Sequence, residues 1–205
     1  LGSRSLQDAI NAAAPGDTLI VKGTCIGSST IDKSLTLKGD GNKLFGQATL
    51  DGGGTDRVLF VDFFDSERQG FGLTIEDLTI THGFGEDGNG GGGLLVQGGT
   101  VVIKNSIVTG NSAGVLSGGG IEVGGGDMTL ANTTVSNNTA GDGGGGIAGG
   151  GTLTIEDSTI TGNTVTGLGG GLDFRGGILT VRNSTVSRNV AYAGAGISNV
   201  AGTVT

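Results

Sequence analysis

Apolar and polar residues alternate in short runs along most of the chain. In "LTIEDSTITGN", which begins at Leu153, the apolar Leu153, Ile155 and Ile160 are separated by polar residues. A second apolar run follows a stretch of glycines and reads "GGGLDF" to Phe174. Alternation with a period of two is typical of half-buried strands and not of helices. The pattern therefore predicts short strands with glycine and asparagine at the corners.

The same pattern recurs at a nearly fixed spacing. Five copies, 28, 27, 25 and 26 residues apart, begin at Leu73, Val101, Met128, Leu153 and Leu179, and "TVT" opens another copy at Val204. Such a period indicates a solenoid, because one repeat cannot bury its own apolar side and must stack on its neighbours. We predict an all-β fold, a single-stranded parallel β-helix of about 25–28 residues per coil, with coils stacked about 4.8 Å apart.

Alignment of the copies predicts which residues stack from coil to coil. Two inward columns are expected: Leu73, Val101, Met128, Leu153 and Leu179, and Leu94, Ile121, Ile147, Leu172 and Ile197. Two corner columns are expected to form structural ladders of stacked side chains: Asp77, Asn105, Asn132, Asp157 and Asn183, and Asn111, Asn138, Asn163 and Asn189. Asn and Asp tolerate left-handed backbone geometry, and stacked amides can bond between coils.

The first part of the chain is less regular. Residues 5–14 predict a short capping helix with Ser5 as N-cap and with Leu6, Ile10 and Ala13 on one face. Residues 17–72 are expected to form irregular first coils with an inserted loop at 62–72, and residues 73–205 the regular coils. We expect a single β-helix domain over residues 1–205, uncapped at its C-terminal end, where "GTVT" lies inside a new coil.

Composition and charge exclude several classes of protein. The 47 glycines and one proline could suggest disorder, but branched apolar residues recur throughout, so the chain should fold. A net charge of −8, spread along the chain, argues against nucleic-acid binding. The single cysteine, Cys25, excludes an intrachain disulfide and is expected to be a small buried thiol. No run of apolar residues is long enough to span a membrane, and no signal peptide is visible.

At the level of whole motifs the chain resembles the right-handed parallel β-helix repeat proteins of bacterial surfaces and secretions, which have the pectate-lyase-like fold. The segment "SLQDAINAAAPGDTLIVKGTC" resembles their capping entry, and the "LTIEDSTITGN…GGGL" copies resemble their coils. The resemblance implies a right-handed solenoid. It leaves activity open, because this superfamily contains pectinolytic enzymes, adhesins, autotransporter passengers and proteins without an assigned function.

The resemblance implies that an enzyme of this fold would carry acidic residues in register on one face. In lyases these form a calcium-binding cluster beside an Arg or Lys base, and in hydrolases they are several aspartates on neighbouring coils. Glu122 and Asp173 share a column two coils apart, near the separation of an inverting carboxylate pair, but lack a partner base. The outward column mixes charges and suits a solvated face: Glu76, Lys104, Ala131, Glu156 and Arg182.

Two other groups of residues are candidates for a catalytic or binding site. His82, near Glu86 and Asp87, could serve as a general acid or base, although a lone histidine at a corner favours a structural role. The inserted loop carries the densest charged patch: Asp62, Asp65, Glu67 and Arg68. The "GGGD" at Asp127 and "GDGG" at Asp142 lack the repetition of calcium-roll motifs. We therefore assign no catalytic residue, cofactor or metal.

Hydroxyl residues form the most regular outward feature. They form a tentative ligand face on one strand of each coil: Thr79, Thr81, Thr109, Thr134, Ser136, Thr159, Thr161, Thr185 and Ser187. Such a lattice resembles the T-x-T faces of β-helical ice-binding proteins, but threonine is also a common residue on an exposed strand face. Carbohydrate-binding surfaces usually offer aromatic side chains on which sugars stack. The chain has no Trp and a single tyrosine, Tyr192, which argues against a lectin or a lyase.

These observations favour a non-enzymatic extracellular β-solenoid: a structural stalk, an adhesin segment or a surface protein that assembles end to end into filaments. The expected partner is the chain itself or the remainder of a longer solenoid, with a polysaccharide or cell surface as a further possibility and no nucleic acid or membrane span. A polysaccharide lyase or glycoside hydrolase of the β-helix type is the first alternative. Ice binding through the threonine face is the second.

Overall fold

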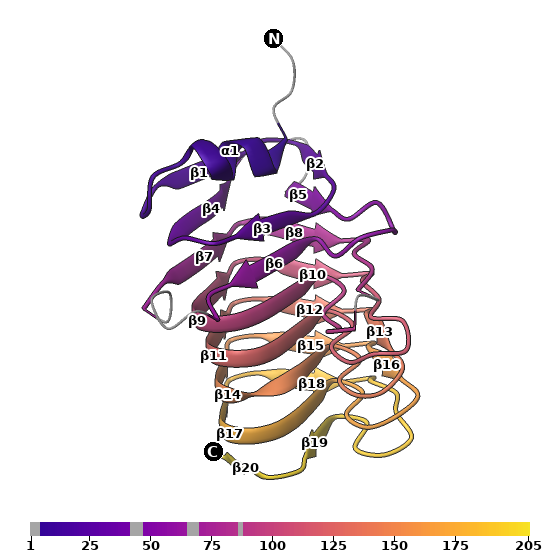
Figure 1. Cartoon of the computed structure of the whole chain (residues 1–205). Coiled ribbons are helices and arrows are strands. Elements are labelled where there is room, and N and C mark those ends of the chain that lie inside the picture. The colour runs from indigo at the N-terminus through magenta and orange to yellow at the C-terminus, as the bar shows by residue number, and fades with distance from the viewer. Residues whose placement is uncertain (1–4, 42–46, 65–69, 86–87) are drawn as a thin grey trace.

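The chain winds into a stack of coils, with the N-terminal helix at one end and the last strands at the other (Figure 1). The computed structural model describes residues 5–41, 47–64, 70–85 and 88–205. Every strand pairing within these residues is parallel, and each strand pairs with the equivalent strand of the next coil. The predicted parallel β-solenoid is therefore confirmed.

Two sheets and a small strand pair make up the walls of the solenoid. The first sheet has 11 strands: β1 (Thr18–Val21), β3 (Ser29–Ile31), β4 (Leu35–Gly39), β6 (Leu59–Asp62), β7 (Gly72–Glu76), β9 (Leu94–Lys104), β11 (Ile121–Ala131), β14 (Ile147–Glu156), β17 (Leu172–Arg182), β19 (Ile197–Asn199) and β20 (Gly202–Val204). The second has seven: β2 (Thr24–Ile26), β5 (Ala48–Asp51), β8 (Leu78–Thr81), β10 (Ile107–Thr109), β12 (Thr134–Ser136), β15 (Thr159–Thr161) and β18 (Thr185–Ser187). The pair consists of β13 (Thr139–Ala140) and β16 (Thr164–Val165).

The predicted capping helix is α1 (Leu6–Ala12), which lies across the first coils (Figure 1). Ser5 is its N-cap and accepts a hydrogen bond from the Asp8 N–H, while the Asp8 carboxylate accepts one from the Ser5 N–H. Ile10 is fully buried, and Leu6 and Ala13 pack against the same core. The apolar face of the helix therefore covers the N-terminal end of the core.

Both predicted inward columns are found in register. Met128 pairs with Val101 and Leu153, and Ile147 pairs with Ile121 and Leu172. All members of the two columns are buried except Ile197, which is partly buried on the last coil. Cys25 differs from the expectation in being only partly buried, since β2 lies close to the end of the stack.

The two corner columns form ladders by different means. Asp77, Asn105, Asn132, Asp157 and Asn183 all have a positive φ near 50°, as predicted for a left-handed corner. At the second corner, the left-handed residues are instead those that precede the ladder: His82, Gly110, Asn137, Gly162 and Arg188. This placement turns the ladder asparagines into the protein, where they are buried.

The buried asparagines bond from coil to coil. The Nδ2 of Asn111 donates to Asn138 Oδ1, that of Asn138 to Asn163 and that of Asn163 to Asn189, each at 3.0 Å. Each acceptor oxygen also receives a backbone N–H from the preceding asparagine. Because a backbone N–H can only donate, it fixes which way each amide points.

One predicted boundary between strands is absent. The run after each glycine stretch and the first run of the next copy were expected as separate strands, but they join into the long strands β9, β11, β14 and β17. Glycines in the middle, such as Gly126 with φ of 87°, form bulges that shift the register without ending the pairing. The inserted loop is likewise shorter than 62–72, because Asp62 ends β6 and Gly72 begins β7.

A layer of stacked loops covers part of the first sheet. These loops include β13 and β16 and lie to the right in Figure 1. They have a small core of their own, formed by Ala113, Ala140 and Val165. The loops return closely over the strands at glycines; at Gly144, φ is 59° and an added Cβ would lie 2.2 Å from the Ile147 carbonyl oxygen. The strand face under this layer is therefore an interior surface.

Candidate functional site

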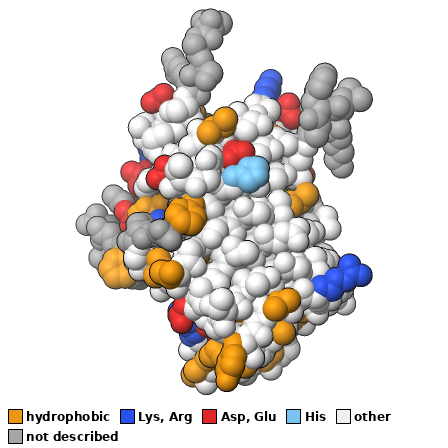
Figure 2. Space-filling model, turned by 90° about the vertical axis from the view of Figure 1, so that its right-hand side faces the viewer, with side chains coloured by type: hydrophobic (Ala, Val, Ile, Leu, Met, Phe, Trp, Pro, Cys, Tyr) orange, Lys and Arg blue, Asp and Glu red, His pale blue; other side chains and the backbone are white. Residues whose placement is uncertain are grey.

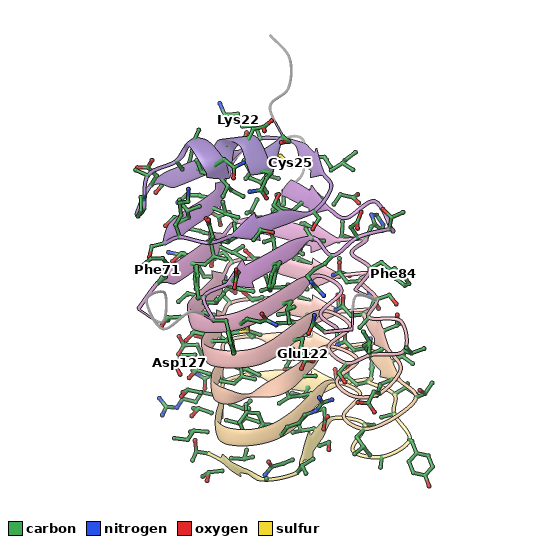
Figure 3. All side chains as sticks on the ribbon, in the orientation of Figure 1. Lys22, Cys25, Phe71, Phe84, Glu122 and Asp127 are labelled. Carbon is green, nitrogen blue, oxygen red and sulfur yellow. The ribbon has the colours of Figure 1, made fainter. Side chains whose placement is uncertain are left out.

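Glu122 and Asp173 lie beneath the loop layer. Glu122 on β11 pairs with Ala148 on β14, which pairs with Asp173 on β17, so the two acids share a column two coils apart as the sequence predicted. Figure 3 labels Glu122 where the long strands meet the stacked loops. The Glu122 side chain is 12% exposed and that of Asp173 is 5% exposed. The column points away from the main core, yet the loops remove it from solvent.

Arg175 supplies the cationic partner that the sequence interpretation lacked. Its Nε donates to Asp173 Oδ2 at 2.8 Å, and its Nη2 donates to the Ser117 hydroxyl at 2.6 Å. Ser117 in turn donates to Asp142 Oδ2 at 3.0 Å. The Nη1 of Arg175 lies 4.0 Å from Glu122 Oε1, which is longer than a hydrogen bond. One guanidinium is therefore shared among three carboxyl groups.

Burial changes the proton affinity of Glu122. Desolvation raises the pKa of its carboxyl group from 4.5 to about 7; the charge of Arg175 opposes this rise, and Asp173 and Asp142 add to it. Burial alone would lower the pKa of Arg175, but its hydrogen bond to Asp173 and the three acidic charges raise it. Near neutral pH, Glu122 can therefore donate or accept a proton while Arg175 stays charged.

A cleft of about 510 Å³ opens beside these residues. Its floor comes from the long strands and its wall from the loops, and it is lined by Gly88, Asn89, Leu95, Gln97, Val115, Leu116, Ser117, Glu122, Gly124, Asp142 and Arg175. Two buried carboxyl oxygens, Glu122 Oε2 and Asp173 Oδ1, have no hydrogen-bond partner among the residues that the structure describes. The cleft thus combines apolar side chains with acidic and basic groups, and can bind a polar ligand or hold a proton donor against one.

Sequence reasoning identified the acid pair but missed Arg175, Ser117 and Asp142. Arg175 follows Asp173 by two residues on the same strand, and this spacing places both side chains on one face. That signal was available in the sequence. Ser117 and Asp142 belong to loops, and no periodic pattern showed that these loops fold back over the strands.

Gly143 allows the network to close. A Cβ added there would lie 2.5 Å from Asp173 Oδ2 and 2.7 Å from Arg175 Nη2. Any larger residue would have to displace this pair. Gly143, which follows Asp142 in "GDGG", therefore has a packing role.

His82 sits at a corner, as the structural interpretation expected. It has a φ of 50°, and its Nδ1 lies 2.9 Å from Asp51 Oδ2 at the surface. The hydrogen bond to His82 lowers the pKa of Asp51, against a smaller opposing effect of burial. Figure 2 shows this histidine in pale blue above a wide surface that is mostly neither charged nor hydrophobic. Glu86 and Asp87 lie outside the described residues.

The outward column of mixed charge carries ion pairs around Glu76. Glu76 lies 2.9 Å from Lys38 and 3.2 Å from Lys104, and hydrogen bonding by Lys38 lowers the pKa of Glu76. Of the charged loop, Asp62 belongs to β6, and Asp65, Glu67 and Arg68 lie outside the described residues. Within the described part of the chain, no three His, Cys, Asp or Glu side chains are grouped to hold a metal ion, and no helix is long and apolar enough to cross a membrane.

The hydroxyl face is regular in space. Thr134 pairs with Ile107 and Thr159, and Ser136 pairs with Thr109 and Thr161, so the columns follow the second sheet. Thr161 and Ser187 hydroxyls lie 3.3 Å apart, and Ser136 donates to Thr109 at 3.2 Å. These side chains bond to one another along the axis, and the carboxyl cluster lies on a different sheet.

Comparison with known proteins gives one match. The family model described as the right handed beta helix region matches residues 62–205. No curated protein and no solved structure matches the chain. The match covers more than half of the chain, including all the residues of the cleft.

Proposed function

The chain belongs to the right-handed β-helix family, and from this premise we propose that it is a non-enzymatic, extracellular β-solenoid, a stalk or adhesin segment at a cell surface. The observation that carries the proposal is the continuous bonding along the axis. Parallel strand pairs and the buried asparagine ladder join each regular coil to the next. Such a stack is rigid along one direction and can hold a binding surface at a distance.

The proposed partner is another β-helix coil, either in a longer solenoid or in a second copy of this chain. β18 ends the second sheet in the described structure and pairs on one side only, with β15. An edge strand offers N–H and C=O groups to an added strand. This is the support for end-to-end association.

Self-association is tested by light scattering and negative-stain electron microscopy over a range of protein concentrations. We expect rods longer than one solenoid. Thr185→Lys on the edge strand should shorten them, and Thr134→Lys, at an equivalent outward position inside the sheet, should not. Monomers at all concentrations would contradict assembly. An antibody against the chain should label intact producing cells; labelling only after permeabilisation would contradict the surface location.

A second candidate function, glycoside hydrolysis or polysaccharide cleavage, is favoured by the protonation of Glu122 near pH 7 and by Asp173 two coils away. The test measures reducing ends and unsaturated products from neutral and acidic polysaccharides, with and without calcium. Glu122→Gln should abolish turnover. A complete lack of products on all substrates would eliminate this candidate.

A further inference from the structure

We propose that Glu122 and Arg175 form a proton-controlled latch, which holds the loops of Ser117 and Asp142 on the long strands while Glu122 is protonated and releases them when Glu122 ionises. The latch lies on the first sheet, whereas the strand edge proposed for assembly belongs to the second. The inference concerns movement of the loop layer, and it stands whether or not the cleft cleaves a substrate.

Arg175 joins one strand to two loops through a single planar group. On β17 its Nε donates to Asp173 at 2.8 Å. Its Nη2 donates to the Ser117 hydroxyl at 2.6 Å and lies 3.5 Å from Asp142 Oδ2. Ser117 lies in the loop before β11 and Asp142 in the loop before β14, and the Ser117 hydroxyl donates to the Asp142 carboxylate. Loss of the bonds at Nη2 would therefore detach both loops from the strand at this point.

Glu122 approaches the other terminal nitrogen of the same guanidinium. Its Oε1 is 4.0 Å from Arg175 Nη1, and its Oε2 has no hydrogen-bond partner in the described part of the chain. The register partners of Glu122 on β9 and β14, Leu95 and Ala148, carry no charge. A neutral carboxyl group can remain in such a place, whereas a buried carboxylate needs hydrogen bonds. Ionised Glu122 must therefore draw Arg175 toward it or admit water from the adjacent cleft.

A rigid guanidinium cannot serve Glu122 and Ser117 equally well. Its nitrogens are fixed in one plane, so a shift of about 1 Å that brings Nη1 within bonding distance of Glu122 also moves Nη2 relative to Ser117. A charge-assisted bond to a carboxylate is roughly twice as strong as a bond between neutral groups. Ionisation of Glu122 therefore makes it the stronger competitor for Arg175.

Ionised Glu122 also repels one of the loops directly. Burial raises the pKa of Glu122 to about 7; the charge of Arg175 opposes this rise, and the charges of Asp173 and Asp142 add to it. These three are the charged groups that act on Glu122 among the described residues. Asp173 is fixed on its strand, but Asp142 is 73% exposed on a loop. Because the repulsion is mutual, the negative charge of Glu122 pushes the Asp142 loop away from the strands.

The two loops are bonded to each other beside the latch. The Leu116 carbonyl accepts from the N–H groups of Gly141 and Asp142, at 3.0 and 3.1 Å. Leu116 packs against the small core of the loop layer, which is a separate cluster from the main core. We therefore expect the loops to move together when the latch opens, while the strands beneath keep their pairing.

Spin labelling of the loop tests the latch in the folded protein. A nitroxide is attached at Val115→Cys in a Cys25→Ser background; Val115 is 77% exposed and lies two residues before Ser117. We expect the rotational correlation time of the label to fall at least twofold between pH 5.5 and pH 8.5, with the midpoint of the Glu122 titration followed by carboxyl NMR. A label at Ile26→Cys, on the exposed side of β2, should not respond to pH.

Two variants identify the groups responsible, each with a matched control. Glu122→Gln should keep the Val115 label slow at both pH values, because the amide cannot ionise, and Glu156→Gln on the outer column should retain the full response. Ser117→Ala removes the acceptor of Nη2, so the label should already be mobile at pH 5.5. Ser136→Ala, which removes a hydroxyl from the second sheet, should not mobilise it.

The Ile26 label distinguishes release of the loops from general loosening of the protein. The proposal is overturned if the Ile26 label responds to pH as strongly as the Val115 label. It is also overturned if the Val115 label is equally mobile at both pH values, if Glu122→Gln retains the response, or if Ser117→Ala is as slow as the wild type at pH 5.5. A slow Ile26 label in Ser117→Ala shows that this variant is folded.

Discussion

Arg175 donates from Nε to the carboxylate of Asp173, two residues earlier on the same strand, at 2.8 Å. The acceptor is almost entirely buried, whereas the donor reaches the cleft. The bond therefore links the interior beneath the loops to the surface at which a ligand would arrive.

Removal of this cation should destabilise the fold and alter the titration of its neighbour. Arg175→Met leaves Asp173 buried without its partner, at a cost of about 2 kcal/mol, less than for a fully buried pair because Arg175 is partly exposed. The charge of Arg175 opposes the raised pKa of Glu122, so that pKa should rise further. Urea unfolding and carboxyl NMR measure the two effects. Lys104→Met should change neither, and an unchanged Glu122 titration in Arg175→Met would contradict the proposed coupling.

Glu122 should make the stability of the protein depend on pH. Its pKa is about 7 in the folded protein against an ordinary 4.5, so between these values the folded state keeps a proton that the unfolded chain releases. The stabilisation is complete below pH 4.5 and is lost as pH rises through 7, a change of about 3 kcal/mol. Glu122→Gln should remove this dependence, as measured by urea unfolding at pH 5 and pH 8. If the free energy of unfolding changed equally between pH 5 and pH 8 in the variant and the wild type, Glu122 would have an ordinary pKa.

The buried amide ladder should contribute more to stability than the exposed corner. Asn138→Ala deprives Asn111 and the Val108 carbonyl of bonds to Asn138 inside the protein, at a cost of about 3 kcal/mol. Asn132→Gly breaks one exposed amide bond to Asn105, keeps the left-handed backbone without strain, and should cost less than about 1 kcal/mol. Denaturant unfolding of both variants provides the comparison. Similar losses in the two would mean that burial of the ladder is unimportant.

Glycines of the loop layer and of the long strands should differ sharply in their tolerance of a methyl group. At Gly145, an added Cβ would lie 2.6 Å from the Gly170 carbonyl oxygen and 2.7 Å from that of Thr164, so Gly145→Ala should cost about 3 kcal/mol. Gly124 meets nothing closer than 3.4 Å and has no positive φ, and Gly124→Ala should be neutral or slightly stabilising. Thermal unfolding of the two variants checks the contrast, and a mild effect at Gly145 would contradict the close approach of neighbouring coils in the loop layer.

The coils could be predicted because the apolar face of each strand must point into the core and stack on the same face of the next coil. Alternation at Leu153 and Ile155, repeated at a fixed spacing, determines both the inward columns and the register. The left-handed corner at Asn105 followed from side-chain chemistry in the same way. These features depend on local pattern and on repetition, both of which are visible in a single sequence.

The site depends on chain paths that do not repeat so regularly. Glu122 alternates with core residues and so points away from the core, yet the returning loop covers it. Ser117 and Asp142 are brought to Arg175 by loops whose course depends on close backbone approach at glycines. Spacing along a strand could identify the pair of Asp173 and Arg175, but not the residues that meet it from the opposite side.

The asparagine ladder also gives the solenoid a direction. In the amide-to-amide bonds from Asn111 to Asn163, each Nδ2 donates to the next coil and each side-chain oxygen accepts from the coil before it. The same Nδ2 also donates to a backbone carbonyl of the preceding coil. Asn189 presents the same orientation, with its oxygen accepting from Asn163. A coil placed beneath it extends the series only if it offers an acceptor in this position. Growth of the stack would therefore be polar, head to tail, and two identical ends could not be joined through the ladder.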